Sequence, residues 1–365
     1  MIYRFDEIAI NSTAKKKPVE SDKFHYIGLE HIDSGTFEIS RWGSDVAPIG
    51  EKLIMKKGDV LFGKRRAYQR KVAIAPIDGI FSAHGMVLRP KEDVICKEFF
   101  PFFMSSNQFM DTAIRISVGG LSPTINWKDL QKQEFELPPI EEQRVLAEKL
   151  WAAYELKEAY RKMIAATDEM VKSQFIEMFR ELPNNGKIED LVDKGIASVK
   201  KSYKTSDEIE YIDISSIDNV SNIVVETTKY EASKAPSRAQ QCVKNGDILV
   251  STVRPINRNI AVVTKKLQNL VASTGFCVLR PKDGYREYLL SIVKSDAYTE
   301  CMCDKASGGL YPAVNNSDVL SYGIHIPDIQ LSQKISAIYQ QADKSKFELR
   351  QAIDKIDKVM KSLLQ

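Results

Sequence analysis

The chain has 365 residues, 43% of them hydrophobic and 28% charged, and its formal net charge is +3 at pH 7. These values are ordinary for a soluble globular protein with room for two domains, and so balanced a charge does not by itself indicate a nucleic-acid partner. No apolar run approaches the ~18 residues of a membrane span, and the N-terminus lacks the apolar region of a signal peptide. The cysteines and histidines lack the spacing of a zinc site. We therefore expect a cytoplasmic protein with no metal site and no membrane contact.

An internal repeat governs the order of the chain. Motifs of the first half recur in the second half in the same order, displaced by 185 to 191 residues. Each half is therefore predicted to be one copy of a single unit, with a globular domain over residues 1–138 and its copy over 183–327. The recurring pairs are Lys15-Lys16 and Lys200-Lys201, Tyr26–Asp33 and Tyr211–Asp218, Lys57–Leu61 and Asn245–Leu249, Val87–Lys91 and Val278–Lys282, and Gly119–Asn126 and Gly308–Asn315.

Within each copy, the pattern predicts a compact α+β domain. The turn residues Gly58-Asp59 and Gly246-Asp247 open apolar runs that are typical of strands. Further strands are expected over Val72–Ile77, Phe81–Leu88, Ile260–Thr264 and Ala272–Leu279, and helices over Glu98–Ile114 and Tyr285–Cys303.

Each domain is followed by a long amphipathic segment, 139–182 in the first copy and 328–365 in the second. Apolar residues recur there at heptad spacing, which requires a partner helix, and the simplest partner of each helix is the other one. The predicted fold is a tandem repeat of two α+β domains whose long helices pack as an antiparallel coiled coil; two helices packed independently on their own domains are the alternative. The predicted seam contains Leu146, Leu150, Ala153, Tyr160, Ile164, Val171, Ile335, Ala342, Leu349, Ile353, Ile356, Met360 and Leu363.

The motifs of several enzyme classes are absent from the sequence. There is no G-x-x-x-x-G-K-[ST] phosphate loop, no G-x-G-x-x-G at the start of a helix and no H-E-x-x-H zinc motif. Pro138-Pro139 lies between leucine and isoleucine, whereas an adenine methyltransferase needs an Asn/Asp-Pro-Pro-aromatic step to hold a flipped base. We therefore expect no catalytic residues in this chain.

The densest positive segment is Lys64–Lys71, with five cations and a tyrosine in eight residues. Its counterpart Thr252–Asn259 keeps two of the arginines, which align as Arg66 with Arg254 and Arg70 with Arg258. Such segments are rich in the donors that contact phosphates and read base edges in the major groove of DNA. A solvated surface hairpin is the alternative interpretation.

Taken together, these motifs resemble the DNA specificity subunit of type I restriction-modification systems. The resemblance rests on the duplicated domain-plus-helix plan, the Gly-Asp-Val/Ile-Leu strand, the Gly-Gly-Leu-x-Pro turn and the Leu-Pro-Pro-Ile-Glu-Glu-Gln start of the first long helix. The second copy departs from the pattern over 327–333, where a one-residue shift is needed to match Gln143 with Gln333.

The resemblance implies two target recognition domains, each reading one half of a split DNA site, with the helices as a spacer. The implied partners are double-stranded DNA, two DNA adenine methyltransferase subunits and restriction/translocase subunits. S-adenosylmethionine and ATP are expected on those partner subunits, and this subunit would bind and position only. Because the two domains differ in sequence, the two half-sites should differ as well.

Comparison of the two copies sorts the candidate DNA contacts. Donors shared by both copies are predicted to hold phosphates: Lys15, Lys16, Arg66, Arg70, Lys200, Lys201, Arg254 and Arg258. Donors that differ are predicted to read bases: Lys64, Gln69, His84, Ser122 and Thr124 in the first domain, and Thr252, Asn257, Asn259, Thr274 and Tyr311 in the second. For His84 and Tyr311, packing within the protein is the alternative.

A coiled-coil scaffold whose two α+β domains bind protein partners rather than DNA would fit the heptads equally well. The local arginine runs favour DNA, and a steep loss of binding with salt would separate the two functions.

Overall fold

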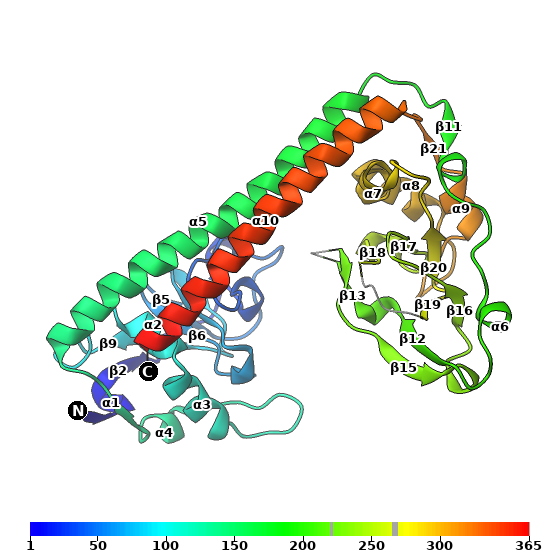
Figure 1. Ribbon diagram of the computed structural model, residues 1–365. Helices are drawn as coiled ribbons and strands as arrows, with labels where there is room; N and C mark the ends of the chain where they lie inside the picture. Colours follow the sequence, from blue (N-terminus) through cyan, green and yellow to red (C-terminus); the bar gives the residue numbers. More distant parts are fainter. Residues whose placement is uncertain (220–221, 265–268, 365) are drawn as a thin grey trace. The chain divides into compact units, whose positions relative to one another are not determined.

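The computed structural model describes residues 1–219, 222–264 and 269–364 (Figure 1). Gln365, predicted as the last residue of the second long helix, lies outside the described residues. The chain divides into two compact units: unit 1 comprises Met1–Met163 with Glu348–Gln365, and unit 2 comprises Ile164–Phe347. No helix in the described ranges is long and apolar enough to cross a membrane.

Unit 1 combines three sheets with short helices. Strand β1 (Ile2–Arg4) pairs with β10 (Glu134–Glu136), the strand that precedes the first long helix. A second sheet has the order β2-β9-β6-β7, with bounds Ala9–Ser12, Met86–Pro90, Val60–Phe62 and Val72–Ile74. A third has the order β3-β5-β8-β4, with bounds Lys15–Lys16, Lys52–Met55, Gly79–Phe81 and Tyr26–Ile27. The helices are α1 (Phe5–Ile8), α2 (Phe100–Ser105), α3 (Asn107–Arg115) and α4 (Trp127–Leu130).

Unit 2 repeats this plan with additional strands. Strand β11 (Gly186–Lys187) pairs with β21 (Gly323–Ile324). One sheet has the order β15-β12-β19-β16, with bounds Thr228–Glu231, Glu208–Ile212, Leu270–Ser273 and Ala239–Cys242. Another has the order β13-β14-β18-β17-β20, with bounds Ile217–Asp218, Ile223–Val224, Ile260–Val262, Ile248–Ser251 and Phe276–Leu279. The helices are α6 (Val199–Ser202), α7 (Arg286–Lys294), α8 (Asp296–Lys305) and α9 (Asn316–Leu320).

The central strands of each unit are buried on both faces, which explains their continuous apolar sequence. In β6, Val60 and Phe62 belong to the core cluster that includes the long helix, whereas Leu61 belongs to a second cluster between the sheets. Strand β17 of unit 2 alternates in the same way, with Ile248 facing the helical core and Leu249 the other. Successive side chains of a strand point to opposite faces, so each such strand separates two cores.

The predicted helices over Glu98–Ile114 and Tyr285–Cys303 are each two helices. The break falls at Ser106 in unit 1 and at Ser295 in unit 2, both with extended backbone. Each serine Oγ accepts a hydrogen bond at 3.2 Å from the backbone N–H three residues later, at Phe109 and Tyr298. These are N-caps, which end one helix and start the next.

The predicted strands over Phe81–Leu88 and Ala272–Leu279 are also divided. In unit 1, a turn after Phe81 separates β8 from β9, and Gly85 N–H donates to the Ser82 carbonyl at 3.0 Å. In unit 2, Thr274 and Gly275 separate β19 from β20. The two strands on either side of each turn belong to different sheets, so one apolar run serves both.

An ion pair within each unit explains two of the repeated motifs. Arg89 makes two bonds to the buried Asp59 carboxylate, at 2.6 and 2.9 Å. Arg280 does the same with the buried Asp247, at 2.9 and 2.7 Å. The Gly-Asp motif thus supplies the carboxylate and the Leu-Arg-Pro-Lys motif the guanidinium, in the bidentate geometry that makes such pairs strong.

The long helices α5 (Ile140–Phe179) and α10 (Ile329–Leu363) run antiparallel, as predicted (Figure 1). Lys157 binds Asp357 at 2.6 Å in unit 1, and Asp168 binds Lys346 at 2.8 Å in unit 2. The two lysines are 189 residues apart in the sequence, as are the two aspartates, so one copy's ion pair reproduces the other's. Every residue of the predicted seam is buried or half-buried. Lys157, a polar interruption of the seam, is buried because Asp357 neutralises it.

The buried polar side chains at the starts of α5 and α10 show which residues of the two copies correspond. The buried Gln143 side chain accepts from Cys96 N–H at 2.8 Å and donates to the Val94 and Pro138 carbonyls. In unit 2 the corresponding buried side chain is Ser332, whose hydroxyl donates to the Gly284 carbonyl at 2.5 Å. Gln333 is exposed, so the one-residue shift that matched it with Gln143 is wrong. A shorter side chain fills this position in the second copy.

Replacing Asp247 by alanine should lower the free energy of unfolding by about 3 kcal/mol, because Arg280 would lose its bidentate acceptor beside the buried site. Urea unfolding followed by circular dichroism measures the loss. Asp283→Ala, at an exposed position nearby, is the matched control and should unfold like the unmodified protein. Equal unfolding midpoints for the two variants would contradict the structural role of the pair.

Candidate nucleic-acid interface

The predicted basic segment of unit 1, residues 64–71, is called the arginine loop below, and residues 119–123 are called the Gly-Gly-Leu loop. Backbone hydrogen bonds connect the two loops. The Gly-Gly-Leu loop is closed by two backbone hydrogen bonds between Val118 and Thr124, at 3.0 and 2.8 Å. Arg66 N–H donates to the Pro123 carbonyl at 2.7 Å, and Ile125 N–H donates to the Lys64 carbonyl at 3.1 Å. Two loops about fifty residues apart in sequence thus form one surface.

Unit 2 builds the same surface from its own arginine loop (252–259) and Gly-Gly-Leu loop (308–312). Ser307 and Ala313 close the latter with backbone bonds of 3.0 and 2.9 Å. Arg254 N–H donates to the Pro312 carbonyl at 2.7 Å, and Val314 N–H donates to the Thr252 carbonyl at 2.9 Å. The bonding pattern matches unit 1 at each position.

The four arginines shared by the copies all have left-handed backbone conformations. Arg66 and Arg70 have φ of 56° and 51° and flank a 3-10 turn over Ala67–Gln69. Arg254 and Arg258 both have φ of 50° and flank the turn Pro255–Asn257. For a residue with a Cβ, this conformation costs about 1–3 kcal/mol, and such strain gathers at functional sites. Each unit holds two arginines in it at equivalent positions.

The first shared arginine of each loop, Arg66 or Arg254, is exposed, and the neighbouring Gly-Gly-Leu loop positions its side chain. Arg66 Nε donates to Ser122 Oγ at 3.1 Å. Arg254 donates to the Leu310 carbonyl at 3.0 Å and lies over the Tyr311 ring, 4.4 Å from its centroid. Since a guanidinium carries five N–H donors, these contacts orient the group while leaving it donors to offer a phosphate.

The second shared arginine of each loop is bonded to a helix of its own unit, α3 in unit 1 and α8 in unit 2. Arg70 donates to Asn107 Oδ1 at 2.8 Å and to Asp111 at 3.0 Å, both in α3. Arg258 pairs with Asp296, the first residue of α8, at 2.7 Å. Hydrogen bonds from Lys172, the larger effect, and from Arg258 lower the pKa of Asp296 below its ordinary value. The comparison of the two copies predicted that all shared arginines contact phosphates. Arg70 and Arg258 also fix the arginine loop on its domain.

Unit 1 gathers positive charge around the arginine loop. Lys64 has a lowered pKa because of burial and the nearby Lys15. Burial also lowers the pKa of His84, and so do Arg65, Lys64 and Lys52. His84 is exposed, and its Nε2 lies 3.4 Å from Nη1 of Arg65. The ring nitrogens of an imidazole can donate or accept hydrogen bonds, and both kinds of contact occur at base edges. Arg65 belongs to the predicted basic segment but was not among the individual contacts, and Lys52 was not predicted at all. Lys52 faces Lys16 across β3 and β5, a pairing that the sequence does not reveal.

The lysine pairs of the two copies lie in different kinds of secondary structure, a strand in unit 1 and a helix in unit 2. Lys15 and Lys16 form strand β3, and Lys16 makes an ion pair with Asp22 at 3.0 Å. Lys200 and Lys201 are exposed in the short helix α6 beside β16. Their equivalence in the sequence therefore does not extend to the fold.

The other predicted base readers differ in accessibility. His84 and Thr274 occupy equivalent exposed turns, and Thr274 N–H donates to the carbonyl of the exposed Arg238, a further cation that was not predicted. Thr252 is buried, and its hydroxyl donates to the Gly275 carbonyl at 3.0 Å, which commits that hydrogen to the protein. Tyr311 is exposed, so it is not a core residue. The remaining candidates are exposed or half-buried: Gln69, Ser122, Thr124, Asn257 and Asn259.

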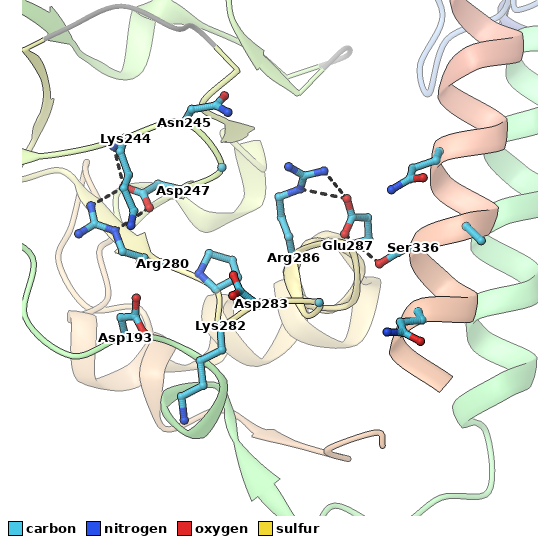
Figure 2. Close-up of a pocket in the computed structure, with 16 residues that line it drawn as sticks. Asp193, Lys244, Asn245, Asp247, Arg280, Lys282, Asp283, Arg286, Glu287 and Ser336 are labelled. Carbon is cyan, nitrogen blue, oxygen red and sulfur yellow. Dashed lines mark hydrogen bonds and ion pairs between the residues drawn. The ribbon is translucent and has the colours of Figure 1, made fainter. Parts of the chain in front are cut away.

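A charged cleft of about 880 Å³ lies in unit 2 and contains none of the predicted DNA contacts (Figure 2). Arg280 is bonded to Asp247 on one side, and Arg286 is bonded to Glu287 on the other. Glu287 also accepts from Ser336 of α10 at 3.1 Å. In each pair the carboxylate neutralises the arginine. The bond between Glu287 and Ser336 connects α7 to α10 at the edge of the cleft. Among the described residues, no group of three or more His, Cys, Asp or Glu could hold a metal ion.

Comparison with known proteins identifies the family. The family model for the type I restriction modification DNA specificity domain matches residues 7–163 and 184–358. The matches cover most of the chain and fall once on each repeat, so the protein belongs to this family.

Two specificity subunits of type I restriction enzymes are similar to parts of this chain. The type I restriction enzyme HindI specificity subunit of Haemophilus influenzae is 34% identical over 123 residues, which are 33% of this chain and 27% of that protein. The EcoDI specificity subunit of Escherichia coli is 26% identical over 183 residues, 48% of this chain and 40% of that protein. The chain thus matches less than half the length of either relative.

A solved structure bears on the fold. A chain from a structure on the complex assembly and conformational transition of the type I R-M system has a TM-score of 0.55 and 17% identity, over 100% of this chain and 96% of that one. At this identity the likeness supports the architecture alone.

We expect Arg66→Gly to weaken binding to every duplex and to reduce the slope of log K against log salt by about one, as loss of a phosphate contact requires. Glycine adopts the positive φ without strain, so stability should not fall. Filter binding at several salt concentrations measures the slope. Arg70→Gly is the matched control, since it should weaken binding by loosening the arginine loop from α3. A change of preference at a single base in Arg66→Gly would contradict the phosphate assignment.

Proposed function

We propose that this chain is a sequence-specific DNA-binding subunit that recognises a bipartite, gapped, asymmetric site. Each unit would read one half-site through its arginine loop and Gly-Gly-Leu loop. Base preference would differ between the units because their variable positions differ, with His84 facing the groove in one and Thr274 in the other. The shared arginines Arg66 and Arg254 would contact the backbone in both.

The observation that carries this proposal is the duplicated two-loop surface. Two surfaces with the same backbone bonds, the same strained arginines and different variable side chains fit two related but unlike half-sites. Membership in the DNA specificity family supports the same function. The cluster of Lys15, Lys52, Lys64 and Arg65 supplies the positive potential that attracts a phosphate backbone.

In this proposal the chain binds and positions, and the chemistry belongs to its partners. These would be two DNA adenine methyltransferase subunits, which hold S-adenosylmethionine, and restriction/translocase subunits, which hold ATP. The sequence contains no phosphate loop or methyltransferase motif that would place either cofactor on this chain.

Selection from random duplex DNA, with the methyltransferase subunit co-expressed, tests the proposal. The expected result is a gapped motif with two unlike halves. Substituting the loop residues of unit 2 alone, such as Arg254→Gly with Thr274→Ala, should then relax only one half. A contiguous motif, or none at low salt, would favour a scaffold that binds proteins.

The helix pair is proposed to set the gap between the half-sites. Deleting residues 159–165 together with 349–355 removes one heptad from each helix and keeps all four ion-pair residues. Seven residues of helix span about 10 Å, close to three base pairs of duplex. The selected gap should therefore shorten by about three base pairs; an unchanged gap in an intact complex would contradict the spacer role.

A further inference from the structure

The tip of each Gly-Gly-Leu loop exposes a leucine almost completely. Leu121 is 97% exposed, the largest value among the large hydrophobic side chains of the described residues, and Leu310 is 85% exposed. They occupy the same position of the two copies. A single exposed apolar residue needs no explanation, but two at one site of a duplicated surface share a cause.

The loop backbone holds each leucine away from the domain. Gly119 and Gly308 have φ of +117° and +108°, which residues with a Cβ rarely adopt. Nothing lies within 4 Å of where a Cβ on Gly120 or Gly309 would be, so the chain before each leucine passes through open space. The paired backbone bonds at the base of each loop fix the tip. The leucine is therefore presented by a closed hairpin.

The leucines lie on the surface that also carries the arginines. The carbonyl of Pro123, two residues after Leu121, accepts from Arg66 N–H, and the carbonyl of Leu310 itself accepts from the Arg254 guanidinium. The arginine loops add exposed apolar side chains of their own at equivalent positions, Tyr68 in unit 1 and Ile256 in unit 2. Each unit thus combines cations with apolar groups at one face.

We propose that Leu121 and Leu310 make apolar contacts with the bases of bound DNA, one in each half-site. This inference rests on the proposed function and deepens it. The arginines of the same surface meet the phosphates, and the leucine beside them reaches into the groove. Two base contacts have this chemistry: a wedge inserted between base pairs, which unstacks them, and contact with a thymine methyl group.

The predicted signature differs from that of a phosphate contact. Burial of a leucine on binding is independent of salt, whereas release of counterions by a cation is not. Leu121→Ser should raise Kd about tenfold with an unchanged salt slope, and Leu310→Ser should do the same. Because the side chains are exposed in the free protein, thermal unfolding should not change.

The experiment uses the full chain with its co-expressed methyltransferase subunit and the duplex obtained by selection. Leu121→Ser, Leu310→Ser and the double variant are compared with Ile2→Ser, a control at an exposed apolar position in β1. The control should bind like the unmodified protein. Two labelled duplexes identify the contact. Fluorescence of 2-aminopurine in the half-site should rise on binding if a leucine unstacks the bases, and uracil in place of thymine should weaken binding if it touches the methyl group.

Either response supports the proposal, provided that the corresponding serine variant abolishes it. Serine variants that bind the duplex with unchanged Kd would overturn the leucine contacts and leave the proposed function standing. Failure of the unmodified protein to bind duplex DNA in a salt-dependent way would overturn both. The two failures are therefore distinguishable in one titration series.

Discussion

Each repeat packs half-buried apolar residues from the other repeat's long helix against its own buried core, and this contact organises the structure. Unit 1 packs Met360 and Leu363, from the helix of the second copy, against its own core. Unit 2 packs Phe175 and Phe179, from the helix of the first copy, against its own. Apolar burial of this kind is the main favourable term in folding. Because each long helix packs on the core of the other copy, the stability of one copy depends on the other. The ion pairs Lys157–Asp357 and Lys346–Asp168 fix the antiparallel register of the two helices.

Residues shared by the copies serve two purposes, and the structure separates them. The pair Asp59–Arg89 and its copy hold strands together, and Ser106 and Ser295 cap helices, so these repeated residues maintain the fold. Arg66, Arg254, Leu121 and Leu310 are exposed and contribute no comparable burial, and both of these arginines have left-handed backbone conformations. Strain and exposure without benefit to folding are the features expected of a binding surface.

The sequence predicted the tandem repeat, the α+β domains and the antiparallel helices, because hydrophobic periodicity and repeated motifs are local signals. It missed the divisions at Ser106 and Ser295, because an apolar helical pattern continued across a capping serine. The alignment of Gln143 with Gln333 failed because burial, rather than residue type, determines the position that Ser332 fills. The phosphate contacts of Arg70 and Arg258 stay a prediction, and their bonds to α3 and α8 could not be foreseen because those partners are distant in sequence. The exposure of Leu121 and the burial of Thr252 follow from tertiary contacts that no local pattern contains.

The central claim is that both two-loop surfaces contact one DNA molecule at the same time. Hydrogen–deuterium exchange of the complex, with and without the selected duplex, measures this most directly. The account predicts slower exchange on DNA binding in 64–71 and 119–124 of unit 1 and in 252–259 and 308–313 of unit 2, with both sets changing at the same DNA concentration. Protection confined to one unit, or found only along α5 and α10, would contradict it.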